Sequence, residues 1–171
     1  LQAAGLLAGE QLIETILLEQ KPVGSVFLIM GVEPPKLLWS SPIAVSDRAV
    51  AYLKKLENLP ESGADRLAFF QQYLEDEDDT LARDAYDEFA IAPYKDVQAL
   101  ETRMDPTKLM QWIETPGVPS NRRRLYATML GVCGTPADAT RIERILLGED
   151  LGDDAADLRS GLDALIACYV V

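Results

Sequence analysis

Residues 73–92 carry the pattern that most constrains the fold of this chain. An acidic turn, Glu75–Asp79, precedes a stretch whose apolar residues recur with the period of an α-helix. These apolar residues are Leu81, Ala82, Ala85, Tyr86, Phe89 and Ala90. Pro93 ends the pattern because proline clashes with the preceding helical turn. Residues 67–74 form a second apolar face before the turn, so we expect two amphipathic helices in an antiparallel hairpin.

The same pattern returns twice further along the chain. Arg83, Arg123 and Arg159 align at separations of 40 and 36 residues, and Tyr86 aligns with Tyr126. The first helices align through Phe70, Tyr73 and Leu74, then Leu109, Trp112 and Ile113, then Ile142, Ile145 and Leu146. Two helices in each period of about 40 residues predict stacked helix pairs. We place these pairs at residues 65–92, 105–134 and 136–171.

From residue 65 to 171 the chain resembles the HEAT-like (armadillo-type) repeat family. The resemblance is carried by the Asp-rich turn, the arginine early in each second helix, and the segment LGVCGTPAD at residues 130–138. It implies a mainly α fold, an α-α superhelix (HEAT-like repeat solenoid) that serves as a scaffold or partner-binding surface. It implies no activity, because the family has no catalytic residues to transfer.

Residues 1–45 have a different character. The segment GSVFLIMG, residues 24–31, predicts a buried strand, because its β-branched and aromatic residues are bounded by glycines. We expect two or three short strands here, in a β-containing or irregular segment that is the remnant of a larger N-terminal region. Residues 1–20 fit either a helix or a strand. Since the chain begins at Leu1 and ends in an apolar segment, we expect a piece of a longer protein, cytoplasmic or exported.

Capping residues predict where several helices begin. Ser46, Asp105 and Thr135 each offer a side-chain oxygen to the first N–H groups of a helix, and a proline follows the last two. The helical part of the chain is therefore expected to span residues 46–171. Residues 93–104 are expected to contain a short bridging helix. Gly161 falls inside the last predicted helix, where it indicates a close approach between helices.

Composition excludes several classes of function. The formal net charge of −12, from 16 basic and 28 acidic residues, argues against nucleic-acid binding and favours cationic partners. Histidine is absent, which excludes Ser-His-Asp and Cys-His catalysis and imidazole metal sites. We expect Cys133 and Cys168 to be reduced, half-buried thiols. No apolar run approaches the roughly 20 residues that a membrane-spanning helix needs.

Two acidic groups are candidates for a chemical site. The turn Glu75–Asp79 offers oxygen ligands for Ca²⁺, but it lacks the spacing of an EF-hand loop. A solvated turn that stabilises the start of the next helix is the preferred interpretation. Asp84 and Glu88 lie on one helix, whereas acid–base chemistry of the glycosidase type needs carboxyl groups across a cleft. We assign no catalytic residue, no metal ligand and no cofactor.

The run Arg122–Arg124 is the main candidate for a binding site. If the second helices lie side by side, Asp84 and Asp87 of one pair face Arg124 of the next. One interpretation is a ladder of salt bridges that sets the register of the pairs. The other is a surface that binds carboxylate or phosphate groups of a partner. The candidate partner-binding residues are Arg122, Arg123, Arg124, Asp84, Asp87 and Glu88.

The sequence thus predicts a non-enzymatic protein–protein interaction or scaffold module, whose partner and oligomeric state it does not name. Binding would proceed through charge complementarity at a helical surface. The alternative is an accessory or regulatory domain of a larger enzyme, or a weak metal-dependent hydrolase that uses the acidic turn.

Overall fold

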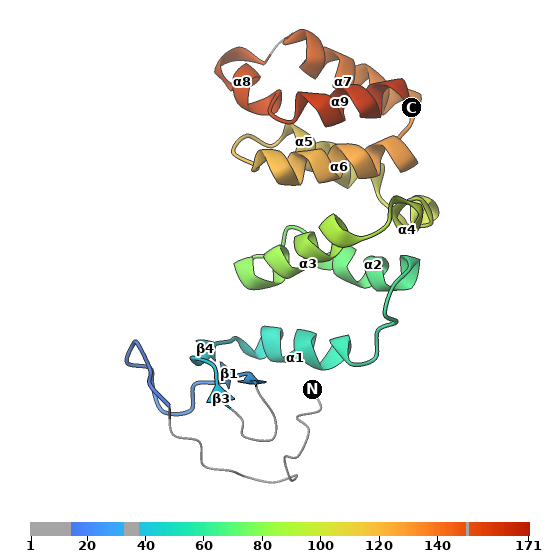
Figure 1. Ribbon diagram of the computed structural model, residues 1–171. Coiled ribbons are helices and arrows are strands. Elements are labelled where there is room, and N and C mark those ends of the chain that lie inside the picture. Colours follow the sequence, from blue (N-terminus) through green and yellow to red (C-terminus); the bar gives the residue numbers. More distant parts are fainter. Residues whose placement is uncertain (1–14, 33–37, 150) are drawn as a thin grey trace. The chain divides into compact units, whose positions relative to one another are not determined.

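A computed structural model describes residues 15–32, 38–149 and 151–171 of the chain (Figure 1). The described residues hold nine α-helices, three short 3-10 helices and four strands of two residues each. The predicted mainly α fold with a small β-containing N-terminal segment is confirmed. The chain divides into two compact units, residues 1–59 and 60–171. None of the helices in the described ranges is long and apolar enough to cross a membrane.

The first unit contains two small antiparallel sheets. β1 (Phe27–Leu28) pairs with β4 (Ile43–Ala44), and β2 (Gly31–Val32) pairs with β3 (Leu38–Trp39). The predicted buried strand over residues 24–31 is wrong, since two separate short strands form there and Val26 and Met30 are exposed. Each described strand has a single neighbour, which is too little sheet to bury a strand. Residues 1–20 fit either a helix or a strand by their sequence, and residues 1–14 of this segment lie outside the described residues.

The helix of the first unit, α1 (Asp47–Leu56), begins as the capping residue predicts. The side-chain oxygen of Ser46 accepts a hydrogen bond from the backbone N–H of Ala49 at 3.0 Å. Ala49 and Tyr52 are buried. The expected boundary between the β-containing part and the helical part lies before this helix, whereas the two compact units meet after it, between Leu59 and Pro60.

The second unit is built from helix pairs that follow one another along the unit (Figure 1). The pairs are α2 (Ala64–Phe70) with α3 (Asp79–Ile91), α5 (Pro106–Glu114) with α6 (Ser120–Cys133), and α7 (Pro136–Leu147) with α9 (Leu162–Val170). The shorter helices are α4 (Tyr94–Gln98), α8 (Ala155–Leu158) and the 3-10 helices Gln71–Tyr73, Glu101–Arg103 and Gly152–Asp154. Helix α6 contacts both α3 and α9, the second helices of the neighbouring pairs.

The apolar stripes read from the sequence form the core of this unit. In α3, Leu81, Ala85 and Phe89 are buried, and Ala90 is the exception because it is exposed. The matching core residues of the other pairs are Leu109, Ile113, Tyr126, Met129, Ile142, Ile145 and Leu165. The bridging helix expected within residues 93–104 is α4, which buries Val97.

The predicted helix starts of this unit are also confirmed. Asp105 Oδ1 accepts from the N–H of Thr107 at 3.0 Å and caps α5. Thr135 and Asp138 form a reciprocal capping box at the start of α7, in which Asp138 Oδ2 accepts from the Thr135 N–H at 3.0 Å.

The third pair departs from the predicted register. Gly161 does not lie inside a helix: its φ is +83°, in the left-handed region, and it immediately precedes α9. Arg159 follows the short helix α8 and so is not placed early in a long second helix, as the alignment requires. The expected close approach does occur at Gly161, where an added Cβ would lie 3.0 Å from Cγ of Arg124.

Candidate functional site

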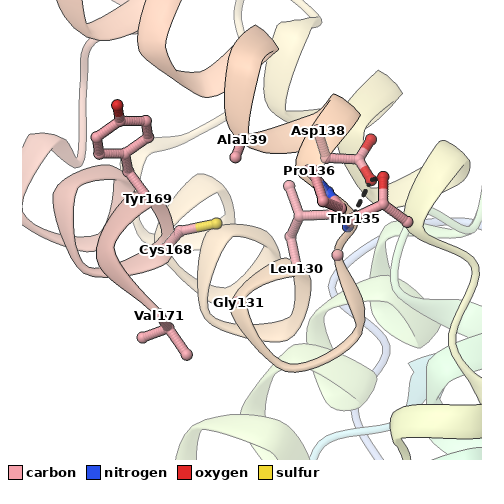
Figure 2. A pocket seen from close by; sticks show the side chains of 10 residues that line it. Leu130, Gly131, Thr135, Pro136, Asp138, Ala139, Cys168, Tyr169 and Val171 are labelled. Carbon is pink, nitrogen blue, oxygen red and sulfur yellow. Dashed lines mark hydrogen bonds between the residues drawn. The ribbon is translucent and has the colours of Figure 1, made fainter.

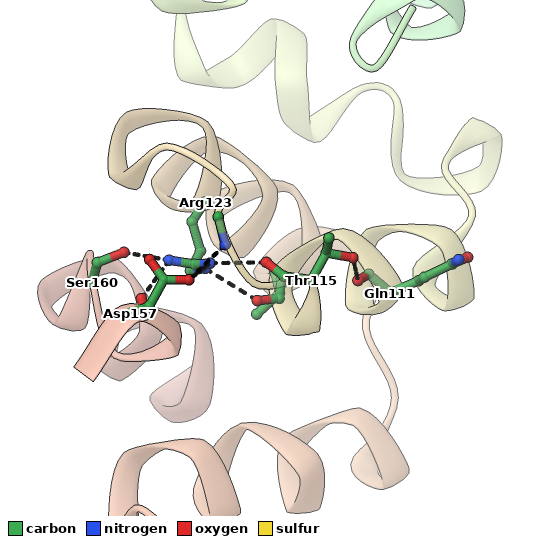
Figure 3. A network of polar contacts seen from close by, with 7 residues as sticks. Gln111, Thr115, Arg123, Asp157 and Ser160 are labelled. Atoms are coloured by element: carbon green, nitrogen blue, oxygen red, sulfur yellow. Dashed lines mark hydrogen bonds and ion pairs between the residues drawn. The ribbon is translucent and has the colours of Figure 1, made fainter. Parts of the chain in front are cut away.

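Arg123 of α6 lies at the centre of a buried polar network (Figure 3). Its side chain has no exposed surface. Nε donates to the Ile113 carbonyl at 3.1 Å, and Nη2 donates to the Thr115 carbonyl at 3.0 Å. Nη1 donates to Ser160 Oγ and to the Asp157 carbonyl. Nη2 also lies 3.2 Å from Asp157 Oδ2. One guanidinium thus joins the end of α5 to α8.

Asp157 of α8 also bonds to the turn that precedes α6. Its Oδ2 accepts from the backbone N–H of Gly117 at 2.8 Å, in the turn between α5 and α6. The hydrogen bond from Gly117, together with Arg123, holds the pKa of Asp157 below its ordinary value. Sequence reasoning missed Asp157, because nothing in its local pattern distinguishes it from the other aspartates of residues 150–157.

Because of these contacts, Arg123 does not belong to the predicted partner-binding surface. A fully buried guanidinium with all its donor groups facing protein acceptors offers nothing to a partner. Its aligned counterpart Arg83 is exposed on α3. The two arginines share a sequence position and have opposite environments.

The neighbours of Arg123 form ion pairs between helix pairs. Arg122 lies 3.5 Å from Glu75, and Arg124 Nε lies 3.0 Å from Asp163 Oδ1 of α9. The bond from Arg124 lowers the pKa of Asp163. Arg141 of α7 is paired with Glu114 of α5. Salt bridges between successive pairs are therefore present, as the ladder interpretation expects, but Asp163 takes the place predicted for Asp84 and Asp87.

Glu75 also accepts a hydrogen bond from the hydroxyl of Tyr126. Tyr126 is a buried residue of α6, and its ring packs against the ring of Trp112. Burial, and then the hydrogen bond to Glu75, raise the pKa of the Tyr126 phenol. Since Arg122 and Tyr126 converge on Glu75, the acidic turn is tied to α6.

The acidic candidates of α3 divide into two kinds. Asp84 and Asp87 are exposed. Glu88 is held by Arg66 of α2, whose Nε donates to Glu88 Oε2 at 2.7 Å. Of the six candidate partner-binding residues, the exposed ones are therefore Asp84, Asp87 and Arg124.

The acidic turn before α3 has structural roles. Asp78 Oδ1 accepts from the N–H of Thr80 at 3.0 Å and caps α3. Asp76 Oδ1 accepts from the N–H of Asp78 at 3.0 Å. Within the ranges that the structure describes, no group of three or more Cys, Asp or Glu side chains is arranged to hold a metal ion.

A pocket of about 370 Å³ opens where the end of α6, the start of α7 and the end of α9 meet (Figure 2). Its lining includes Leu130, Pro136, Asp138, Ala139, Cys168 and Val171. We call it the α6–α9 pocket. Its walls are mainly apolar, and Asp138 is the one acidic side chain among the described residues that line it.

The two cysteines lie at this end of the unit. Both are free and half-buried, as predicted. Burial raises the pKa of the Cys133 and Cys168 thiols to about 11, and the charge of Asp138 acts in the same direction on both. Both thiols therefore stay protonated at neutral pH and are poor nucleophiles.

No family model, curated protein or solved structure matches this chain. Any statement about its function must therefore be argued from its own residues.

Proposed function

We propose that residues 60–171 form a HEAT-like α-α superhelix that acts as a non-enzymatic protein–protein interaction or scaffold module. The observation that carries the proposal is the serial contact between second helices, in which α6 packs against both α3 and α9. In a repeat array each unit contacts its neighbours, and the row of equivalent helices forms an extended binding surface.

The ion pairs and hydrogen bonds that join the helix pairs support this function. Arg122, Arg123 and Arg124 each bind an acceptor in a different helix pair or turn, so their charges hold the stack together. The carboxylates in these bonds serve as structural acceptors. A scaffold needs such links between units, whereas catalysis needs titratable groups that converge on a cavity.

The exposed part of the candidate surface is smaller than the sequence suggested. Its exposed residues are Asp84 and Asp87 on α3 and Arg124 on α6, which is half exposed and also contacts Asp163. Exposed carboxylates on α3 and an exposed guanidinium on α6 favour a partner with a matching charge pattern. An accessory domain of a larger enzyme would use the same surface. The metal-dependent hydrolase has no observation in its favour within the described residues, and we do not propose it.

Affinity capture from a lysate of the source organism tests this proposal. The chain is compared with Asp84→Lys/Asp87→Lys and with the control Asp153→Lys/Asp154→Lys, which changes net charge equally on the exposed Gly152–Asp154 turn. Circular dichroism verifies that all three forms are helical. We expect a protein that the original and control chains capture and the α3 variant loses. Equal capture by all three forms contradicts the assigned surface, and capture of nothing specific contradicts the function.

A further inference from the structure

We propose that the α6–α9 pocket binds the side chain of a lysine from a partner protein. This proposal adds a binding site to the proposed interaction module. It rests on the proposed function only in taking the lysine to belong to a partner protein. It uses none of the surface residues Asp84, Asp87 and Arg124.

The size and walls of the pocket suit an aliphatic stem. A volume of about 370 Å³ falls in the range of small-ligand pockets, which is roughly 300–1,000 Å³. Leu130 of α6 and Pro136 and Ala139 of α7 supply apolar surface, and Val171, which follows α9, also lines the pocket (Figure 2). Lysine buries its methylene chain on such surface while its ammonium group seeks a polar partner.

Asp138 supplies that polar partner. The residue is 9% exposed, and its Oδ2 is already occupied by the N–H and hydroxyl of Thr135. Its Oδ1 accepts no hydrogen bond from any described residue. Among the described residues, Asp138 Oδ1 is not one of the fully buried side-chain atoms that lack a partner, so it keeps some contact with solvent. A largely buried carboxylate with one oxygen that no protein donor occupies is a suitable partner for a cation.

The single open oxygen favours lysine over arginine. A guanidinium gains its advantage by donating two parallel hydrogen bonds to both oxygens of a carboxylate. Thr135 already holds one of the two oxygens of Asp138. An ammonium group is a point charge that needs only one acceptor, and therefore fits what Asp138 leaves free.

The end of α6 adds to the negative potential. Helix α6 ends at the pocket, and the C-terminal end of a helix carries a partial negative charge. The opposite charge at the start of α7 is offset by the capping box of Thr135 and Asp138. Among the described residues that line the pocket there is no arginine or lysine to compensate. The net charge of −12 further draws a basic partner toward the molecule.

Short capped peptides test the proposal directly. The probe is acetyl-Gly-Lys-Gly-amide, and its controls carry arginine or the uncharged isostere norleucine in place of lysine. Binding is followed by NMR shifts of the Leu130, Ala139 and Val171 methyl groups. We expect the lysine peptide to bind at millimolar concentration, about tenfold more tightly than norleucine, because one charge-assisted hydrogen bond is gained. Arginine should bind less tightly than lysine.

Two variants separate the charge of the pocket from its shape. Asp138→Asn keeps an oxygen for the capping box and should weaken lysine binding about tenfold while leaving norleucine binding unchanged. Gly131→Ala places a methyl group in the pocket lining at 3.5 Å from Cα of Cys168, an ordinary contact, so the fold should persist while both peptides bind less. Asp87→Asn removes one charge elsewhere and should change nothing.

Three results would overturn the proposal: no binding of the lysine peptide at millimolar concentration, equal binding of lysine and norleucine, or equal losses from Asp138→Asn and Asp87→Asn. The last would mean a general charge effect. Because these variants lie away from α3, a failure here with partner capture still dependent on Asp84 and Asp87 refutes the lysine pocket and leaves the interaction module standing.

Discussion

Helices α3 and α6 hold matching places in successive helix pairs, yet they use their matching arginines in opposite ways. Arg83 of α3 is exposed, whereas Arg123 of α6 is fully buried and hydrogen-bonded. Both helices pack an apolar stripe against their own first helix. The difference shows that the stripe sets which face turns inward, but that neighbouring carbonyls decide whether a charged side chain is buried.

The ends of the two first helices explain this difference. Helix α5 ends at Glu114 and leaves carbonyl groups of its last turn without helical partners. Arg123 supplies donors to two of these, at Ile113 and Thr115. Helix α2 continues directly into the 3-10 helix Gln71–Tyr73, whose backbone N–H groups serve its last carbonyls. The first pair therefore needs no buried arginine.

Replacing the two arginines should give the largest contrast. Arg123→Ala removes the donors that serve the carbonyls of Ile113, Thr115 and Asp157, and should lower the free energy of unfolding by about 3–5 kcal/mol. Arg83→Ala should change it by no more than about 0.5 kcal/mol, as at other exposed positions. Urea unfolding followed by circular dichroism measures both values. Equal effects would mean that the two environments do not differ. Arg123→Lys should not restore stability, because the three donors of an ammonium group sit on one nitrogen and cannot span the acceptors that the five guanidinium N–H groups reach.

Two glycines with positive φ test how closely α6 packs on its neighbours. Gly117 lies in the turn before α6, and Gly161 immediately precedes α9. Gly117 and Gly161 both have positive φ, at 80° and 83°, so alanine at either position should cost about 1–2 kcal/mol of backbone strain. An added Cβ at Gly117 meets nothing within 4 Å, whereas at Gly161 it lies 3.0 Å from Arg124. Gly161→Ala should therefore destabilise more than Gly117→Ala in the same unfolding experiment. The reverse order would contradict the close contact of α6 with the start of α9.

Tyr126 gives the smallest of these effects and the one that depends on pH. Tyr126→Phe removes the hydrogen bond to Glu75 and should cost about 1 kcal/mol at neutral pH. The folded chain keeps the Tyr126 proton to a higher pH than the unfolded chain, because the pKa is raised. The contribution is therefore complete below about pH 10 and is lost as pH rises above it. Unfolding free energies between pH 8 and about 11 should fall less steeply in Tyr126→Phe, and an unchanged slope would contradict the burial of this phenol.

The helix pairs could be predicted because their signals are local. The apolar period fixes the buried face, and Asp105 and Thr135 mark helix starts within one turn. The buried network could not be predicted, because Asp157 is 34 residues from Arg123 in the sequence. The α6–α9 pocket joins three helices that no local pattern relates. The place of Gly161 could not be predicted either. A glycine inside a helix and a left-handed glycine just before a helix cannot be told apart from the sequence pattern alone.

Side-chain NMR of the arginines tests the central claim, that α6 carries a buried structural arginine where α3 carries an exposed one. Hydrogen exchange of the Nε–H groups is compared between Arg123 and Arg83 in the unaltered chain. We expect Arg123 Nε–H to exchange at least about a hundredfold more slowly than Arg83 Nε–H, since its hydrogen bond to Ile113 opens only when α5 and α6 separate. Equal exchange rates would show that Arg123 is open to water and would contradict this account of how the helix pairs are held together.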